Sequence, residues 1–185
     1  MSELERLLAD INSADEASKQ KSRWQPEQQG EIDIHIRVDG SWYHQGRKFQ
    51  RASLVKLFAG ILRREDDAYF LVTPVEKLRI RVDDAPFVAG LVETIEEQGQ
   101  QVIVFTTNIG ERIMLDSEHS LRIKLDATSG EPRPYIHLRA GLEALISRSA
   151  FYDLVNLAVE TSRDGSRYLS VCSCGNSFEL GTTDE

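Results

Sequence analysis

Charged side chains cluster in two short connections near the middle of the chain. The run Thr73-Pro74-Val75-Glu76-Lys77 joins two expected strands, and Asp83-Asp84-Ala85-Pro86 follows the second of them. If Glu76, Lys77 and Asp84 converge, the lysine would face an anion and the carboxylates would accept hydrogen bonds from a ribose or a base edge. The alternative is structural, because Asp bonds nearby backbone amides and Pro presets φ in a tight turn. The residues alone leave both interpretations open.

Three arginines are further candidates for binding a phosphate. Arg79 and Arg81 alternate with apolar residues over 78–82, so the two side chains share one face of the expected strand. Such a pair could hold a phosphate in a bidentate manner, although a solvated sheet face would have the same pattern. Arg51 falls at the start of an expected helix, where the helix dipole disfavours a cation. This cost predicts a specific partner for Arg51, such as a carboxylate of the neighbouring sheet.

Other patterns of catalytic or metal-binding residues are missing from the sequence. The phosphate-loop, dinucleotide-binding and nucleophile-elbow motifs are absent, and the four histidines are scattered. Cys172 and Cys174 have no second cysteine pair with which to form a structural zinc site, and a disulfide between them would be strained. We therefore expect no catalytic residue, no metal and no cofactor. A reduced, cytoplasmic protein that is not an enzyme is the simplest interpretation.

The charge of the chain limits the class of partner. Its 185 residues carry a formal net charge of −8, whereas proteins that bind DNA or RNA polymers present a basic stripe. A local basic pocket for a small anion is compatible with this charge, and so is a protein partner. Since no apolar run approaches the roughly 18 residues that span a bilayer, we expect no membrane insertion.

Hydrophobic spacing predicts the elements that would position these residues. In the first half it predicts a helix over 3–11, a linker over 12–30, a strand from Ile32 to Val38, a helix over 51–63, and strands over 69–72 and 78–82. In the second half it predicts an antiparallel meander of strands over 87–95, 101–107, 111–116 and 121–125, then a loop at Pro132 and Pro134, a strand over 135–139, a helix from Ser149 to about residue 163, and a hairpin turn at Asp164-Gly165.

The sequence also contains an internal repeat. Phe49–Leu57 aligns without gaps on Ile146–Leu154, 97 residues later, and the same offset carries Asp67 onto Asp164. We therefore expect an α+β fold of two related units, each with an amphipathic helix packed on a curved, mostly antiparallel sheet. The predicted division is an N-terminal helix and linker over 1–30, a first unit over 31–85 and a second over 86–185. Ligands often bind between such units.

Five strings resemble the bacterial domain-of-unknown-function family number 1285. They are Asp39-Gly40-Ser41-Trp42-Tyr43, Arg51–Phe58, Tyr69–Lys77, Val82-Asp83-Asp84-Ala85-Pro86-Phe87 and Thr106-Thr107-Asn108. The resemblance covers about residues 24–175, and Asp67-Ala68 stands where the family would have Asp-Gly. It implies a duplicated α+β fold whose second domain is superficially similar to pleckstrin-homology-like barrels.

The resemblance also implies a ligand and a role. It implies a nucleotide-type ligand at the interface of the two domains and a function in signal transduction. The positions carried over are Thr73, Glu76, Lys77, Asp84, Phe87, Thr107 and Asn108. The leading hypothesis is a cytoplasmic sensor or adaptor that binds a small nucleotide-like anion. One alternative is a protein–protein interaction module without a small ligand. The other is a hydrolase of a nucleotide-like substrate, with Glu76 or Asp84 as its base.

Overall fold

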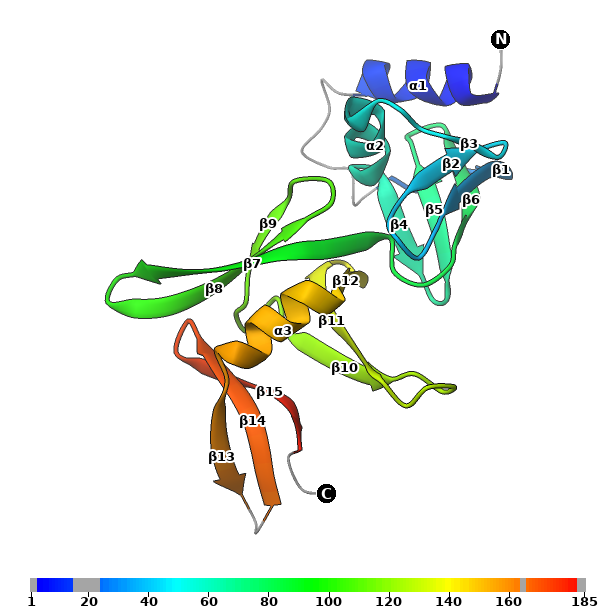
Figure 1. The fold of residues 1–185 in the computed structure, drawn as a ribbon. Helices are drawn as coiled ribbons and strands as arrows, with labels where there is room; N and C mark the ends of the chain where they lie inside the picture. Colours follow the sequence, from blue (N-terminus) through cyan, green and yellow to red (C-terminus); the bar gives the residue numbers. More distant parts are fainter. Residues whose placement is uncertain (1–2, 15–23, 164–165, 183–185) are drawn as a thin grey trace. The chain divides into compact units, whose positions relative to one another are not determined.

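The fold consists of two compact α+β units. A computed structural model describes residues 3–14, 24–163 and 166–182 of the chain (Figure 1). Unit 1 spans residues 1–84 and unit 2 spans residues 85–185. Part of the predicted linker and the predicted turn at Asp164-Gly165 lie outside the described residues. No helix in the described ranges has the length and apolar character needed to cross a membrane.

Unit 1 is built on one six-stranded sheet. Its elements are helices α1 (Glu3–Ala14) and α2 (Ala52–Ala59) and strands β1 (Gln28–Ile36), β2 (Trp42–His44), β3 (Arg47–Lys48), β4 (Leu62–Glu65), β5 (Ala68–Val72) and β6 (Glu76–Val82). The strand order is β3-β2-β1-β6-β5-β4, in which β1 and β6 are parallel and the other neighbours antiparallel. Helix α2 packs through Phe58, whose ring lies 6.5 Å from that of Trp42 in β2. The buried aromatic contact holds the last turn of α2 against β2.

Helix α2 is shorter than the predicted helix over 51–63. It ends at Ala59, where the amide of Gly60 donates to the carbonyl of Lys56, and β4 begins at Leu62. Leu62 is buried and pairs with Leu71 of β5, so its apolar side chain serves the sheet core rather than a helix face. The helical spacing continued into the strand because both elements bury their apolar residues against the same core.

Unit 2 contains a six-stranded sheet, a helix and a three-stranded sheet. The first sheet comprises β7 (Phe87–Glu97), β8 (Gln100–Thr107), β9 (Arg112–Met114), β10 (Leu121–Leu125), β11 (Pro132–Arg139) and β12 (Leu142–Ile146), in the order β10-β11-β12-β7-β8-β9. Helix α3 (Arg148–Asn156) packs on β7 and is followed by β13 (Val159–Arg163), β14 (Ser166–Ser173) and β15 (Asn176–Thr182). Only β7 and β12 are parallel neighbours in the described part of unit 2. The predicted strands from 87 to 125 are present, but the predicted meander is correct only for β7, β8 and β9, because β10 pairs with β11 at the opposite edge of the sheet.

Two predictions in unit 2 are wrong. Pro132 and Pro134 lie in β11 and not in a loop, because the strand pairs only with β10 at these positions and the other edge needs no amide donor there. Helix α3 ends at Asn156 rather than near 163, and the β-branched Val159 begins a strand instead. Its N-cap is Ser147, whose Oγ accepts a hydrogen bond from the amide of Ala150 at 3.2 Å, and not Ser149.

The internal repeat is visible as a recurring arrangement. In unit 1, α2 is followed by the antiparallel meander β4-β5-β6, and in unit 2, α3 is followed by the antiparallel meander β13-β14-β15. The predicted duplicated α+β organisation is confirmed. Neither sheet of the described residues in unit 2 closes on itself. The likeness to pleckstrin-homology barrels stays a prediction.

Candidate functional site

The connection between β5 and β6 is a tightly bonded turn. Thr73 is completely buried, and its Oγ1 accepts hydrogen bonds from the amides of Val75 at 3.2 Å and Glu76 at 3.1 Å. The amide of Thr73 donates to the carbonyl of Glu76 at 2.9 Å, so Thr73 and Glu76 close the turn from both sides. The buried hydroxyl oxygen thus satisfies two backbone donors of the turn. Thr73 therefore has a structural task independent of any ligand.

Lys77 is held inside unit 1. Its side chain is only 17% exposed, Nζ lies 2.8 Å from Oε2 of Glu65, and Nζ stands 4.8 Å from the ring centre of Phe70. The hydrogen bond from Lys77 lowers the pKa of Glu65 below its usual value, and the charge of Lys77 adds to this, while partial burial opposes it. The positive charge predicted to face an anion is thus balanced by Glu65.

Arg79 and Arg81 share one exposed face of β6, as predicted. The guanidinium of Arg81 lies 3.8 Å from Oδ1 of Asp33 on the neighbouring strand β1. Arg79 stands opposite Glu31 in the register of the same two strands. This face therefore alternates cations with carboxylates, the arrangement of a solvated sheet surface.

The remaining predicted residues lie at strand ends. Asp84 is half-buried at the end of unit 1, and Phe87 is fully buried at the start of β7. In the β8–β9 turn, Oγ1 of Thr107 accepts from the amide of Glu111 at 3.1 Å. Oδ1 of Asn108 accepts a hydrogen bond from the backbone amide of Val88 at 3.1 Å. The backbone amide of Asn108 donates to the Val88 carbonyl at 2.8 Å. Asn108 is thus bonded to Val88, the residue after Phe87, while Thr107 closes its own turn.

A group of basic side chains, of which the sequence singled out only Arg51, surrounds a hollow in unit 1. We call this the basic hollow; it has a volume of about 510 Å3 and is lined by His44, Gln45, Arg47, Lys48, Phe49, Gln50, Arg51 and Leu54. The tight β2–β3 hairpin forms one wall, with positive φ angles of 48° at Gln45 and 74° at Gly46. The start of α2 forms the other. The sequence signal that could have indicated this hollow is the presence of four basic residues within eight positions around Gln45-Gly46.

The cations of the basic hollow are exposed, and the charge of one of them, Lys48, helps to lower the pKa of Asp39, after the larger effect of the hydrogen bonds from Ser41. Within residues 3–14, 24–163 and 166–182, no carboxylate pairs with Arg47 or Arg51. Arg51 is the N-cap of α2 and gives it no side-chain cap, and the amides of Ala52 and Ser53 donate to no described residue. A helix N-terminus carries a partial positive charge that attracts anions. Arg51, the N-cap of α2, lines the hollow, so the positive end of the helix lies beside the side-chain cations.

An aromatic pair borders the same hollow. The rings of His44 and Phe49 are stacked, with centroids 6.3 Å apart and planes 19° from parallel. The ring centroid of Phe49 lies 5.6 Å from that of Phe58 in α2, and this contact anchors the pair to the core of unit 1. A planar ring can stack on such a surface. The hollow thus combines cations with an aromatic wall.

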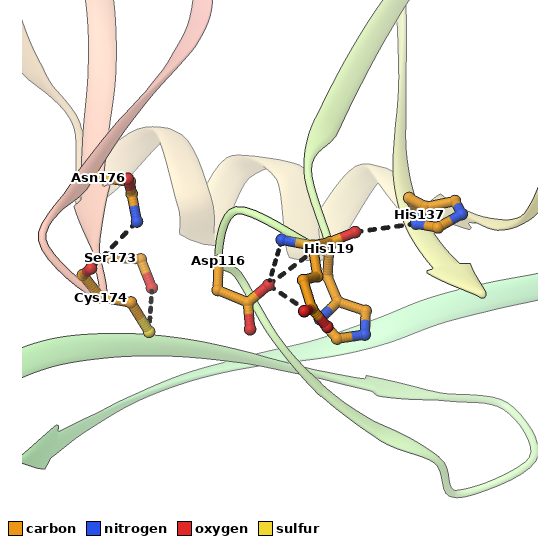
Figure 2. Close-up of polar contacts among 7 residues, drawn as sticks. Asp116, His119, His137, Ser173, Cys174 and Asn176 are labelled. Carbon is orange, nitrogen blue, oxygen red and sulfur yellow. Dashed lines mark hydrogen bonds and ion pairs between the residues drawn. The ribbon is translucent and has the colours of Figure 1, made fainter.

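The histidines of unit 2 belong to loop-bracing contacts (Figure 2). Oδ1 of Asp116 accepts from the amides of Glu118 at 2.9 Å and His119 at 2.8 Å, and lies 2.9 Å from Nδ1 of His119. Although burial raises the pKa of Asp116, the hydrogen bonds from His119 and Glu118 outweigh it and lower that pKa. Nδ1 of His137 lies 3.0 Å from the carbonyl of Glu118, and its Nε2 accepts from the amide of Gly141. Both ring nitrogens of His137 are therefore engaged.

The cysteines lie near the β14–β15 turn. Cys172 and Cys174 are free thiols, and Nδ2 of Asn176 donates to the carbonyl of Cys174 at 3.1 Å (Figure 2). Oγ of the buried Ser173 accepts from the amide of Ile103 at 2.9 Å, which ties the turn to β8. In the part of the chain that the structure describes, no three His, Cys, Asp or Glu side chains are grouped so that they could hold a metal ion.

Comparisons with known proteins place both units in one family. The model for the N-terminal domain of DUF1285, a domain of unknown function, matches residues 21–85. The model for the C-terminal domain of DUF1285, described as a protein of unknown function, matches residues 86–180. No curated protein matches the chain.

Two crystal structures are similar to the chain. A DUF1285 family protein from Silicibacter pomeroyi DSS-3 is 43% identical, with a TM-score of 0.82 over 96% of this chain and 95% of its own. A DUF1285 family protein from Shewanella baltica OS155 is 32% identical, with a TM-score of 0.55 over 68% of this chain and 91% of its own.

Proposed function

The chain belongs to the DUF1285 family, and we propose that it is a cytoplasmic sensor or adaptor, without enzymatic activity, that binds a small nucleotide-like anion. One observation carries this proposal, namely the basic hollow at the start of α2. We assign the phosphate-binding role to Arg47, Lys48 and Arg51. The separate prediction that a ligand lies between the two units stays a prediction.

Electrostatics support an anion in the basic hollow. Three cations close together repel one another, and the described part of the chain supplies no carboxylate to Arg47 or Arg51. The protein as a whole is acidic, with a formal net charge of −8, so this local excess of positive charge stands out against its surroundings. A phosphate would relieve the repulsion. It would also accept hydrogen bonds from the guanidinium of Arg51 in a bidentate manner, next to the positive end of α2.

Size and shape support a nucleotide-like ligand over phosphate alone. The volume of about 510 Å3 falls in the usual range of small-molecule sites, roughly 300–1,000 Å3. The stacked pair of His44 and Phe49 offers a flat surface for a base beside the cations. A ligand that carries both a phosphate and a planar ring would use both features.

Isothermal titration calorimetry with nucleoside mono- and triphosphates and with inorganic pyrophosphate tests this function. We expect saturable binding that weakens with salt, and a loss of at least about tenfold in affinity for Arg51→Ala and for Arg47→Ala. Arg167→Ala is the matched control, because Arg167 is an exposed arginine of unit 2 that lies outside the hollow. Tighter binding of nucleotides than of pyrophosphate would support a role for the aromatic pair. Absence of binding across this panel would overturn the proposal.

A protein–protein interaction module is the second candidate function. It is favoured by Leu91 and Ile95, two large apolar residues of β7 in unit 2 that are 50% and 40% exposed. Loss of a partner in pull-down experiments with Leu91→Ser, with nucleotide binding unaffected, would support it. The hydrolase alternative requires turnover of a nucleotide that Glu76→Gln abolishes while binding is retained.

A further inference from the structure

We propose that unit 2 carries a second anion site, at the position that corresponds to the basic hollow, and that the chain's own Glu131 occupies it. The ligand class that would displace Glu131 is a phosphate monoester attached to an aromatic ring. This inference rests on the proposed function in one respect, because it assumes that the repeat preserves the same mode of anion recognition. Its test is independent of whether unit 1 binds anything.

The internal repeat relates the two hollows position by position. The hollow in unit 2, of about 270 Å3, is lined by Glu131, Pro132, Arg133, Pro134, Leu145, Ile146, Ser147, Arg148, Phe151 and Tyr152. Five of its lining residues stand 97 positions after residues that line the basic hollow: Leu145 after Lys48, Ile146 after Phe49, Ser147 after Gln50, Arg148 after Arg51, and Phe151 after Leu54. Both hollows thus lie at the start of the equivalent helix, with an arginine at the equivalent position. Coincidence is a poor explanation for this correspondence.

The two arginines differ in what they bind. Nη2 of Arg148 lies 2.5 Å from Oε2 of Glu131, whereas no carboxylate of the described residues pairs with Arg51. Glu131 therefore places an oxyanion against the arginine that corresponds to Arg51. We infer that this carboxylate stands where a phosphate would bind. Unit 2 shows the recognition of an anion with an internal group in the place of the ligand.

The Glu131–Arg148 pair can be exchanged at low cost. The side chains are 58% and 69% exposed, and exposed ion pairs contribute little to stability because water screens them. The backbone of Glu131 is fixed by the turn before β11, where its carbonyl accepts from the amide of Asp126 at 2.8 Å. Only the side chain of Glu131 has to rotate for an external anion to reach Arg148. The pair thus acts as a competitor rather than as a stabilising bridge.

The walls of this hollow specify an aromatic ligand. Where unit 1 presents Lys48 and Leu54, unit 2 presents Leu145 and Phe151. Prolines at 132 and 134 and the ring of Tyr152 complete a largely apolar lining. Two cations remain, Arg148 and Arg133, and the latter also lies 3.7 Å from Asp126. One phosphate with an aromatic ring matches this set better than a polyphosphate, which would need more positive charge.

The test compares variants in an Arg51→Ala background, so that unit 1 does not contribute. Phenyl phosphate and inorganic phosphate are titrated, followed by amide chemical shifts of Ser147 to Tyr152. We expect Arg51→Ala/Glu131→Gln to bind phenyl phosphate about two- to fivefold more tightly than Arg51→Ala, with shifts confined to these amides. Adding Arg148→Ala should remove the gain. Glu131→Ala, which removes the carboxylate by a different change, should give the same result.

Each outcome separates this inference from the proposed function. No gain with either Glu131 variant, or a gain that survives Arg148→Ala, overturns the inference even when wild-type protein binds nucleotides through Arg51. A gain that depends on Arg148 supports it even when unit 1 binds nothing. Equal gains for phenyl phosphate and inorganic phosphate would overturn the aromatic specificity.

Discussion

Nζ of Lys77 in β6 lies 2.8 Å from Oε2 of Glu65 in β4. A lysine predicted to face a ligand is therefore paired with a carboxylate of its own sheet. Lys77 is also the more buried partner, at 17% exposed against 39% for Glu65. Removing the lysine would leave Glu65 without its main hydrogen-bond donor, whereas removing a ligand-facing lysine would leave stability unchanged. Lys77 therefore tests whether the candidates on β6 act in stability or in binding.

We expect Lys77→Met to lower the free energy of unfolding at pH 7 by up to about 1 kcal/mol, the upper end for partly exposed pairs. The effect should depend on pH. Because the hydrogen bond from Lys77 depresses the pKa of Glu65, the contribution is present above the usual carboxyl pKa of 4.5 and is lost as pH falls through the lowered value. Urea unfolding at pH 7 and pH 3 measures the loss of unfolding free energy and its dependence on pH. Lys56→Met, at an exposed position of α2, is the control. Equal stability of the two variants at pH 7 would contradict the prediction.

Thr73 should contribute to stability through its hydroxyl oxygen. Thr73→Val has nearly the same shape but leaves the amides of Val75 and Glu76 without that acceptor, so we expect a loss of about 0.5–1.5 kcal/mol. Thr73→Ser keeps the oxygen and should recover most of the loss. Chemical denaturation of the three proteins provides the comparison. If valine were tolerated as well as serine, the hydroxyl would have no structural role in the turn.

Asp116 should make the loop before β10 sensitive to acid. Hydrogen bonds from His119 and Glu118 hold its pKa below the usual value despite partial burial. The carboxylate therefore stabilises the folded state above the usual carboxyl pKa of 3.8, and this stabilisation disappears as pH falls through the lowered value. We expect the stability difference between wild type and Asp116→Asn to be largest near pH 7 and to shrink below about pH 4. A difference that stays constant from pH 7 to pH 3 would exclude this linkage.

The sequence predicted those elements whose signal is local. The repeat placed helix starts at Arg51 and near Arg148, and the alternation of Ile32, Ile34 and Ile36 predicted β1, whose buried face the structure confirms. The helix ends were wrong for a common reason. Apolar spacing continued through Leu62 and through Val159 into strands whose pairing partners lie farther along the chain. Periodicity alone does not report which partner a segment will meet.

The basic hollow was missed for a different physical reason. His44, Arg47, Lys48 and Arg51 have the i, i+3, i+4, i+7 spacing of one helix face, yet they lie in a hairpin and a helix cap, so this spacing does not explain why they converge. Their convergence depends on the positive φ angles at 45 and 46, which fold the short hairpin back on itself. By contrast, the strings that the sequence favoured occur at turns and strand ends, where the side chains of Thr73 and Asn108 accept hydrogen bonds from the backbone and Lys77 pairs with Glu65.

Asn108 should stabilise the start of β7 through its hydrogen bonds to Val88. The side-chain Oδ1 and the backbone amide of Asn108 bond the amide and the carbonyl of Val88. Asn108→Ala removes the side-chain contact, while Asn108→Asp retains the acceptor oxygen. We expect the alanine variant to lose about 0.5–1.5 kcal/mol of unfolding free energy. The amide of Val88 should also exchange faster with solvent, while amides in the middle of β8 keep their rates. Hydrogen exchange followed by NMR resolves this local effect, and the aspartate variant should stay close to wild type. Unchanged exchange at Val88 in Asn108→Ala would mean that the neighbouring strand pairing, and not the side chain, holds this corner of unit 2 in place.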